Sequence, residues 1–197
     1  MKTRFYSKRW FDLSLTLLLC WLLLLTCAEA ATVLSGNVSG TWKTNGSPYI
    51  LSADCTVASD QTLIIHPGVE VVILPNVSLV VNGGIAAVGT QMQPITIRGA
   101  SPTNYWESIQ MIHNGFTNKF QHCRISEGND ALWLSVSGGD RTMVAEIAEC
   151  DFRNCRNSAI LGQAWGYQAT GPAGSPVGSA TLAPGIHNCV CSTMHHC

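Results

Sequence analysis

Residues 63–98 read LIIHPGVEVVILPNVSLVVNGGIAAVGTQMQPITIR, and their pattern decides the fold class. Apolar and polar residues alternate with a period of two, which is typical of β-strands rather than helices. When the stretch is written in steps of sixteen residues from Leu63, similar residues fall into the same columns. The shared columns are Leu63 with Leu79 and Ile95, Ile65 with Val81 and Ile97, Val69 with Ile85, and Pro67-Gly68 with Gly83-Gly84.

A repeat of this length is too short to be a domain, and it predicts one coil of a stack. Each coil would hold two or three short strands joined by tight turns. The next coil would lie about 4.8 Å away and pair with it in parallel. The apolar columns would then fill the interior of a parallel β-helix, a solenoid stabilised mainly by contacts between neighbouring coils. An antiparallel sandwich is the alternative, and the agreement of the columns favours the solenoid.

Several short motifs carry a family resemblance. They are Gly40-Thr41-Trp42, Ser47-Pro48-Tyr49-Ile50, TLIIHPGVEV at 62–71, Asn82-Gly83-Gly84-Ile85, Gly89-Thr90, Pro94-Ile95-Thr96-Ile97 and Trp106-Glu107-Ser108-Ile109. Together they resemble secreted bacterial right-handed parallel β-helix proteins of the pectin-lyase-like fold, with Ser108 where that family has glycine. The resemblance covers residues 36–161 and implies an all-β solenoid. It does not imply one activity, because this fold hosts polysaccharide lyases, hydrolases and adhesins.

The second half of the chain predicts longer coils of the same kind. HCRIS at 122–126 aligns with ECDFR at 149–153, and NDAL at 129–132 aligns with NSAI at 157–160. NCVCS at 188–192 fits the first of these patterns. Three cysteines, Cys123, Cys150 and Cys189, are therefore expected in one inward column, where free cysteine packs as a small apolar side chain. A disulfide between Cys150 and Cys155 is the alternative.

The first thirty residues predict a secretory signal peptide. Four basic residues precede position 13, residues 13–25 are apolar, and Ala28-Glu29-Ala30 supplies small residues for cleavage after Ala30. The protein is therefore expected to be secreted or held in the cell envelope. An uncleaved membrane anchor is the alternative. No second long apolar run follows, so no membrane span is expected after cleavage.

Five segments follow from these patterns. They are the signal peptide at 1–30, an N-terminal cap at 31–61, parallel β-helix coils at 62–162, a flexible Gly/Pro-rich loop at 163–186 and a partial further coil at 187–197. Cleavage leaves 7 of the 11 Lys and Arg and 10 of the 12 Asp and Glu, a net charge of −3. This balance argues against a nucleic-acid partner, which needs a basic face. Seven cysteines remain, an odd number that cannot all pair within one chain.

Four residues are the candidates for catalysis. Glu149 and Asp151 flank the inward Cys150 and should point outward, with His122 one coil from Glu149 and Arg124 one coil from Asp151. An acid/base cluster on a sugar-binding face is one interpretation. The favoured interpretation is two surface pairs, each of which contributes about 0–1 kcal/mol to stability. The chain has no Asp-Asp pair and no Gly-His-Gly or Arg-Ile-Lys motif such as polygalacturonases use.

The C-terminal tail supplies the candidates for a metal site. Its ligand types suit zinc, but their spacing matches no common zinc module. The favoured interpretation of the tail is therefore the partial further coil. The five candidate ligands are Cys189, Cys191, His195, His196 and Cys197. Three tryptophans, Trp106, Trp133 and Trp165, could instead stack on sugar rings, although packing is the commoner use of this side chain.

The favoured function is an exported, non-catalytic β-helix module that contacts polysaccharide or another envelope component. No cofactor is expected. The alternatives are a remnant of a polysaccharide lyase or glycoside hydrolase, and the structural N-terminal part of a longer protein.

Overall fold

The computed structural model describes residues 31–112, 115–137, 141–165 and 180–192, all within the compact unit Ala31–Cys197. These residues form short strands and one 3-10 turn, Thr44–Gly46. The strands are β1 (Thr32–Asn37), β2 (Gly40–Trp42), β3 (Tyr49–Val57), β4 (Thr62–Ile65), β5 (Glu70–Ile73), β6 (Leu79–Val81), β7 (Gly84–Val88), β8 (Ile95–Gly99), β9 (Ile109–Ile112), β10 (Thr117–Gln121), β11 (Cys123–Ser126), β12 (Asp130–Ser137), β13 (Arg141–Ala148), β14 (Asp151–Arg153), β15 (Ser158–Trp165), β16 (Ala180–His187) and β17 (Val190–Ser192). No helix among the described residues is long and apolar enough to cross a membrane.

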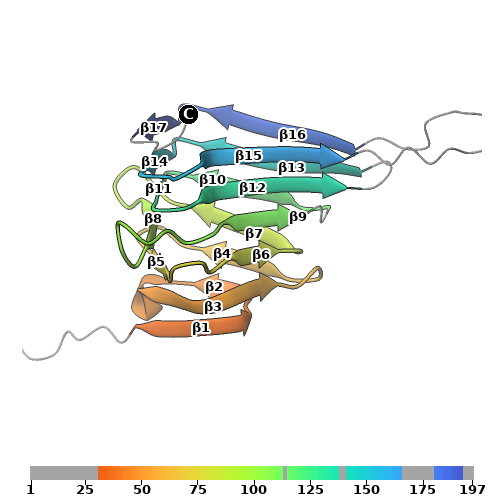
Figure 1. Cartoon of the computed structure of the whole chain (residues 1–197). Coiled ribbons are helices and arrows are strands. Elements are labelled where there is room, and N and C mark those ends of the chain that lie inside the picture. The colour runs from red at the N-terminus through yellow and green to blue at the C-terminus, as the bar shows by residue number, and fades with distance from the viewer. Residues whose placement is uncertain (1–30, 113–114, 138–140, 166–179, 193–197) are drawn as a thin grey trace, which may run out of the picture. The chain divides into compact units, whose positions relative to one another are not determined.

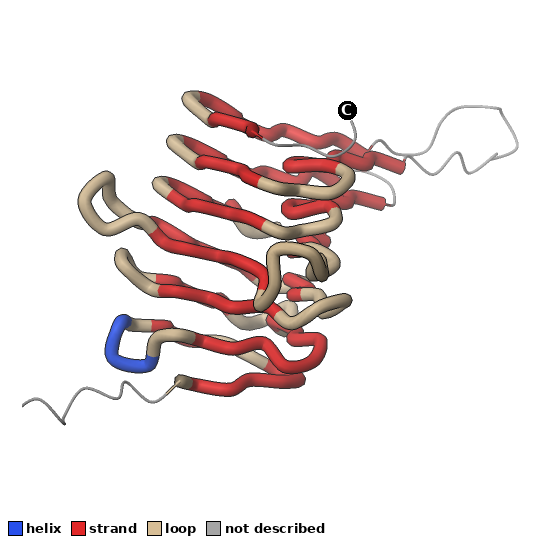
Figure 2. Tube along the Cα trace, turned by 60° about the vertical axis from the view of Figure 1, so that its left-hand side comes forward, coloured by secondary structure: helices blue, strands red, loops and turns tan. Residues whose placement is uncertain are grey.

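All described strand pairs are parallel, and they follow one rule. From β4 onward each strand pairs with the strand three places later, as β4 does with β7 and β5 does with β8. Figure 1 shows the strands stacked from β1 at one end to β16 and β17 at the other. Figure 2 shows the tube returning repeatedly to the same side. One such circuit of the chain is called a layer below. The predicted all-β, parallel arrangement is confirmed, and it is compatible with a β-helix.

Two sheets run along the stack. One has the strand order β16-β13-β10-β7-β4-β2. The other has eleven strands and folds around β3, whose first residues pair with β5 and whose last residues pair with β6. Consecutive strands of one layer therefore lie on different faces of the stack. The turns between them fall in rows along its edges.

The sixteen-residue period is not the length of a coil, and this part of the prediction is wrong. Leu63 pairs with Ile85, not with a residue of the next sixteen-residue line. Leu79 pairs with Cys55 and Ile109, and Ile95 pairs with Cys123. Sixteen residues carry the chain from β4 to β6 and from β6 to β8, which are not neighbours. The columns still matched because sixteen is an even number, so each step preserves the inward-facing phase of a strand.

The alignments in the second half of the chain are confirmed as strand registers. Arg124 lies opposite Asp151, and Leu132 lies opposite Ile160. Val190 lies opposite Asp151 on the other side, which extends the column by one layer. These motifs recur once per layer, so they report the layer spacing directly.

Inward side chains fill the space between the sheets as stacked apolar columns. One column runs through Val71, Ile97, Ile125 and Phe152, none of which is more than 2% exposed. Burial of each such side chain contributes about 1.5–3 kcal/mol. Trp106 is fully buried, and its indole Nε1 donates a hydrogen bond to the carbonyl oxygen of Ser126 at 2.7 Å. The core therefore continues without a break from layer to layer.

Strands occupy parts of the segments at both ends of the described stack. Residues 31–61, predicted as a cap, hold three strands, and β1 lies along the edge of β3. Part of the predicted loop 163–186 is strand, because β15 extends to Trp165 and β16 begins at Ala180. Pro184 lies within β16, which among the described strands pairs with β13 alone, and proline is accepted in such an edge strand.

Candidate functional site

A groove of about 460 Å³ lies along the edge where β10 turns into β11 and β13 turns into β14. Its walls include all four residues that the sequence marked as catalytic candidates, together with part of the loop between β7 and β8. The lining residues are His122, Cys123, Arg124, Glu149 and Asp151 from the two turns and the strands after them, and Thr90, Gln91 and Pro94 from the loop. The predicted set is therefore brought together in space.

The groove exists because one layer has a longer turn than its neighbours. Residues 89–94 separate β7 from β8, whereas His122 alone separates β10 from β11. The turn from β13 to β14 is also short, comprising Glu149 and Cys150. The longer loop stands out beyond the shorter turns stacked beside it and so forms one wall of the groove. The sequence motif Gly89-Thr90 marked this turn, but nothing in it indicated a groove.

His122 and Glu149 occupy equivalent positions in consecutive layers and share an uncommon backbone conformation. Their φ angles are 48° and 53°, in the left-handed region that side-chain-bearing residues rarely adopt. Each residue is held by a backbone bond to the next layer, from His122 N to Ala148 O at 3.1 Å and from Glu149 N to His187 O at 3.2 Å. Both side chains are thereby fixed on the rim of the groove.

The predicted register is right, but the predicted pairs do not form. Asp151 makes its ion pair with Arg153, which is two residues along the same strand and therefore on the same outward face. Glu149 Oε1 accepts a hydrogen bond from Asn188 Nδ2 at 2.7 Å, one layer further on. Within the described residues Arg124 has no hydrogen bond or ion pair through its guanidinium. It is therefore available to a ligand.

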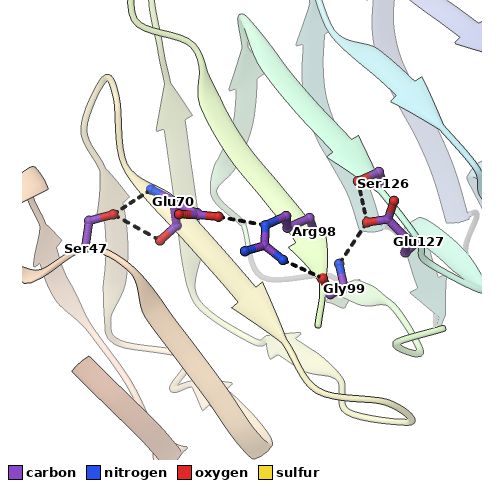
Figure 3. Close-up of polar contacts among 6 residues, drawn as sticks. All are labelled: Ser47, Glu70, Arg98, Gly99, Ser126 and Glu127. Carbon is purple, nitrogen blue, oxygen red and sulfur yellow. Dashed lines mark hydrogen bonds and ion pairs between the residues drawn. The ribbon is translucent and has the colours of Figure 1, made fainter. Parts of the chain in front are cut away.

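A polar network on neighbouring strands of the same sheet face shows the contrast (Figure 3). Arg98 Nε donates to Glu70 Oε1 at 2.7 Å, and Arg98 Nη1 donates to the carbonyl oxygen of Gly99 at 3.0 Å. The adjoining Gly99 N–H donates to Glu127 Oε2 at 3.2 Å, which also accepts a bond from Ser126 Oγ at 2.6 Å. Glu70 N donates to Ser47 Oγ at 2.9 Å. Arg98 thus bonds to its own chain through two of its guanidinium nitrogens, whereas the guanidinium of Arg124, one layer away, has no partner among the described residues.

A second groove of about 340 Å³ lies on another turn edge. Again a long loop forms one wall, here residues 100–108 between β8 and β9. The lining residues are Pro75, Asn76, Thr103, Asn104, Tyr105, Asn129 and Arg156. Most are neutral, and Asn129 Nδ2 already donates to Glu107 Oε2 at 2.8 Å. Sequence reasoning missed this groove, because its loop has no repeated motif.

The tryptophans do not form a sugar-stacking platform together. Trp106 is in the core, which is the commoner place for this side chain. Trp133 is half-buried and lies between Gln110 and Leu161 on the outward phase of its strand, while Leu132 and Leu134 face inward. The side chain of Trp165 lies outside the part of the structure that is described.

Two of the five predicted metal ligands lie within the described residues, and three lie outside them. Cys189 is partly buried and Cys191 is exposed, and both are free thiols. His195, His196 and Cys197 lie outside the described residues. In the part of the chain that is described, no three His, Cys, Asp or Glu side chains converge on one point. The tail site therefore stays a prediction.

No protein-family model matches the chain, and no curated protein or solved structure is significantly similar to it.

Proposed function

We propose that the chain is an exported right-handed parallel β-helix of the pectin-lyase-like kind, whose surface binds an acidic polysaccharide without catalysing its breakdown. The solenoid interpretation is supported by the parallel pairing of every third strand. The handedness is supported by a general rule, since parallel crossover connections are almost always right-handed. Export is supported by the signal-like first thirty residues.

One observation carries the ligand class. Arg124 lies in the wall of the 460 Å³ groove and its guanidinium has no partner among the described residues, whereas Arg98 on the neighbouring strand is held by Glu70 and the carbonyl oxygen of Gly99. A guanidinium recognises carboxylates through two parallel N–H···O bonds, which a neutral sugar does not offer. The nearby Asp151 is neutralised by Arg153, so it does not repel an anion strongly. Uronate-containing polymers fit this chemistry.

The test compares two arginine variants by isothermal titration calorimetry with polyuronate oligosaccharides and with neutral oligosaccharides of equal length. Arg124→Ala should weaken polyuronate binding at least tenfold, since a charge-assisted bond is worth about 1.5–3 kcal/mol. Arg98→Ala, the matched control, should leave the affinity unchanged. Equal affinity for charged and neutral polymers, or equal loss in both variants, would contradict the proposal.

An enzyme acting on the same polymers is the second candidate. It is favoured by the position of His122 and Glu149 on the rim of the groove, where an imidazole and a carboxylate could exchange protons with a bound sugar. A lyase would release products with a new carbon–carbon double bond, which absorb ultraviolet light. A hydrolase would release reducing ends. Release that is abolished in both His122→Ala and Glu149→Gln would establish catalysis, and absence of release from polyuronates that do bind would exclude it for those substrates.

A further inference from the structure

Three cysteines stack in one column at the C-terminal end of the described stack. Cys123, Cys150 and Cys189 occupy equivalent places in three consecutive layers, as the registers of β11 with β14 and of β14 with β17 require. Cys123 and Cys150 are each 1% exposed, whereas Cys189 is partly exposed. All three are free thiols, and of the three only Cys123 lines the proposed polysaccharide groove.

The thiols of the column contact one another. The thiols of Cys123 and Cys189 both interact with the thiol of Cys150, which lies between them in the column. The interaction with Cys123, and to a smaller extent that with Cys189, lowers the pKa of the Cys150 thiol. Cys189 also contacts the carbonyl oxygens of Ile147 and His187 at 3.5 and 3.4 Å.

We propose that Cys150 and Cys189 form a reversible disulfide that fastens β17 to β14. Neighbouring strands lie about 4.8 Å apart, and the Cα atoms of a disulfide are separated by about 4.4–6.8 Å. Two features select Cys189 over Cys123 as the partner. Among the described strands β17 lies at the end of its sheet and pairs with β14 alone, so it can shift toward Cys150. Cys123 belongs to a layer that is paired on both sides.

The chemistry is a thiol–disulfide exchange with a small-molecule disulfide such as oxidised glutathione. The partly exposed Cys189 loses its proton to solvent and attacks one sulfur of the oxidant, so that a mixed disulfide forms and one glutathione thiolate leaves. The Cys150 thiolate then attacks the Cys189 sulfur and displaces the second glutathione. Two protein thiols are oxidised, and one glutathione disulfide is reduced to two thiols.

The test equilibrates the full chain in buffers with graded ratios of oxidised to reduced glutathione. Remaining thiols are then alkylated, and the peptides are identified by mass spectrometry. A peptide pair joined through Cys150 and Cys189, lighter by two hydrogen atoms than its reduced parts, should increase as the buffer becomes more oxidising. The thermal midpoint should be several degrees higher for the oxidised protein than for the reduced one.

Two variants make the assignment specific. Cys123→Ser removes the third thiol of the column and should leave the Cys150–Cys189 linkage intact. Cys189→Ala, at the partly exposed end where folding is least affected, should abolish both the linkage and the difference in thermal midpoint. The proposal is overturned if folded protein links Cys123 to Cys150 or Cys155 to Cys191 instead. It is equally overturned if no linkage forms, or if the midpoint difference persists in Cys189→Ala.

Discussion

Residues in the left-handed backbone region mark the turns of this stack. The side-chain-bearing ones among the described residues are Asn76, His122, Glu127, Glu149, Asn154 and Asn188. Asparagine tolerates this region because its short amide can bond to the nearby backbone. Histidine and glutamate gain no such compensation, so at His122 and Glu149 the chain accepts a local cost. His122 and Glu149 line the larger groove, whereas Glu127, which has the same backbone conformation, does not.

Replacing His122 by glycine should therefore make the protein more stable. His122→Gly relieves the positive φ of 48°, and we expect the free energy of unfolding to rise by about 0.5–1 kcal/mol. The measurement is urea unfolding followed by circular dichroism. Asn76→Gly is the matched control, because Asn76 has a φ of 60° that asparagine already tolerates, and its stability should hardly change. Destabilisation of His122→Gly would show that the imidazole is needed for folding.

Cys155 should make the protein less stable in alkali. The thiol is fully buried, and this burial raises its pKa from 9.0 to about 11. Below pH 9 the thiol is protonated in both states. Between pH 9 and 11 the unfolded chain loses the proton while the folded chain keeps it, so stability falls by about 2 kcal/mol over this window. Cys155→Ala should flatten that part of the curve of unfolding free energy against pH.

The control for this prediction is a core truncation that carries no titratable group. Ile125→Val should lower the stability by about 0.5–1.5 kcal/mol to the same extent at every pH. If Cys155→Ala and the wild-type protein show parallel curves between pH 9 and 11, the buried thiol does not contribute to the alkaline loss.

For the strands, the sequence predicted their parallel direction and their inward-facing side chains better than it predicted the number of residues in a layer. Alternation fixed which side chains of β4, β6 and β8 face inward, because that property depends only on the two-residue period. The number of strands per layer depends on where the chain turns back, and residues 63–98 repeat within a layer as well as between layers. The C-terminal motifs were reliable because HCRIS and ECDFR each occur once per layer.

The candidate site was predictable in its members but not in its contacts. Period-two spacing put His122, Arg124, Glu149 and Asp151 on one edge, and the groove contains all four. The partner of Asp151 was missed, although Arg153 stands two residues away on the same face and the spacing alone could have indicated it. The groove itself depends on the different lengths of stacked turns, which only the register of the strands reveals.

Gly83 is the turn residue whose replacement should disturb a strand connection most. A Cβ atom at this position would lie 2.0 Å from the carbonyl oxygen of Gln61 and 2.2 Å from that of Ala58. The turns before β4 and before β7 pack backbone against backbone here, so neither side can yield as a flexible side chain would. Gly83→Ala should lower the free energy of unfolding by about 3 kcal/mol.

Chemical unfolding of two glycine variants measures this effect. Gly185→Ala is the control, since a Cβ atom there meets nothing within 4 Å, and its stability should stay within about 0.5 kcal/mol of the wild-type value. Equal unfolding midpoints for Gly83→Ala and Gly185→Ala would mean that the two turns can separate at little cost.

For the whole molecule, stability and recognition are located in different places. The inward columns repeat from layer to layer and hold the stack together, whereas both grooves lie on turn edges where one loop is longer than its neighbours. A stack of parallel layers accepts longer turns without disturbing its ladders, because each layer contacts only the next. Binding surfaces can therefore be built on the edges while the core stays regular.

Export is the prediction that concerns the chain as a whole. Production in a secreting bacterial host should release a protein that begins at Ala31, because small residues at positions 28 and 30 fit the pocket of a signal peptidase. Ala30→Tyr should block cleavage and leave the chain in the membrane fraction. Glu29→Gln keeps both small residues and should be processed normally. N-terminal sequencing and intact mass distinguish these outcomes, and a wild-type chain that keeps Met1 in the membrane fraction would establish an uncleaved anchor instead.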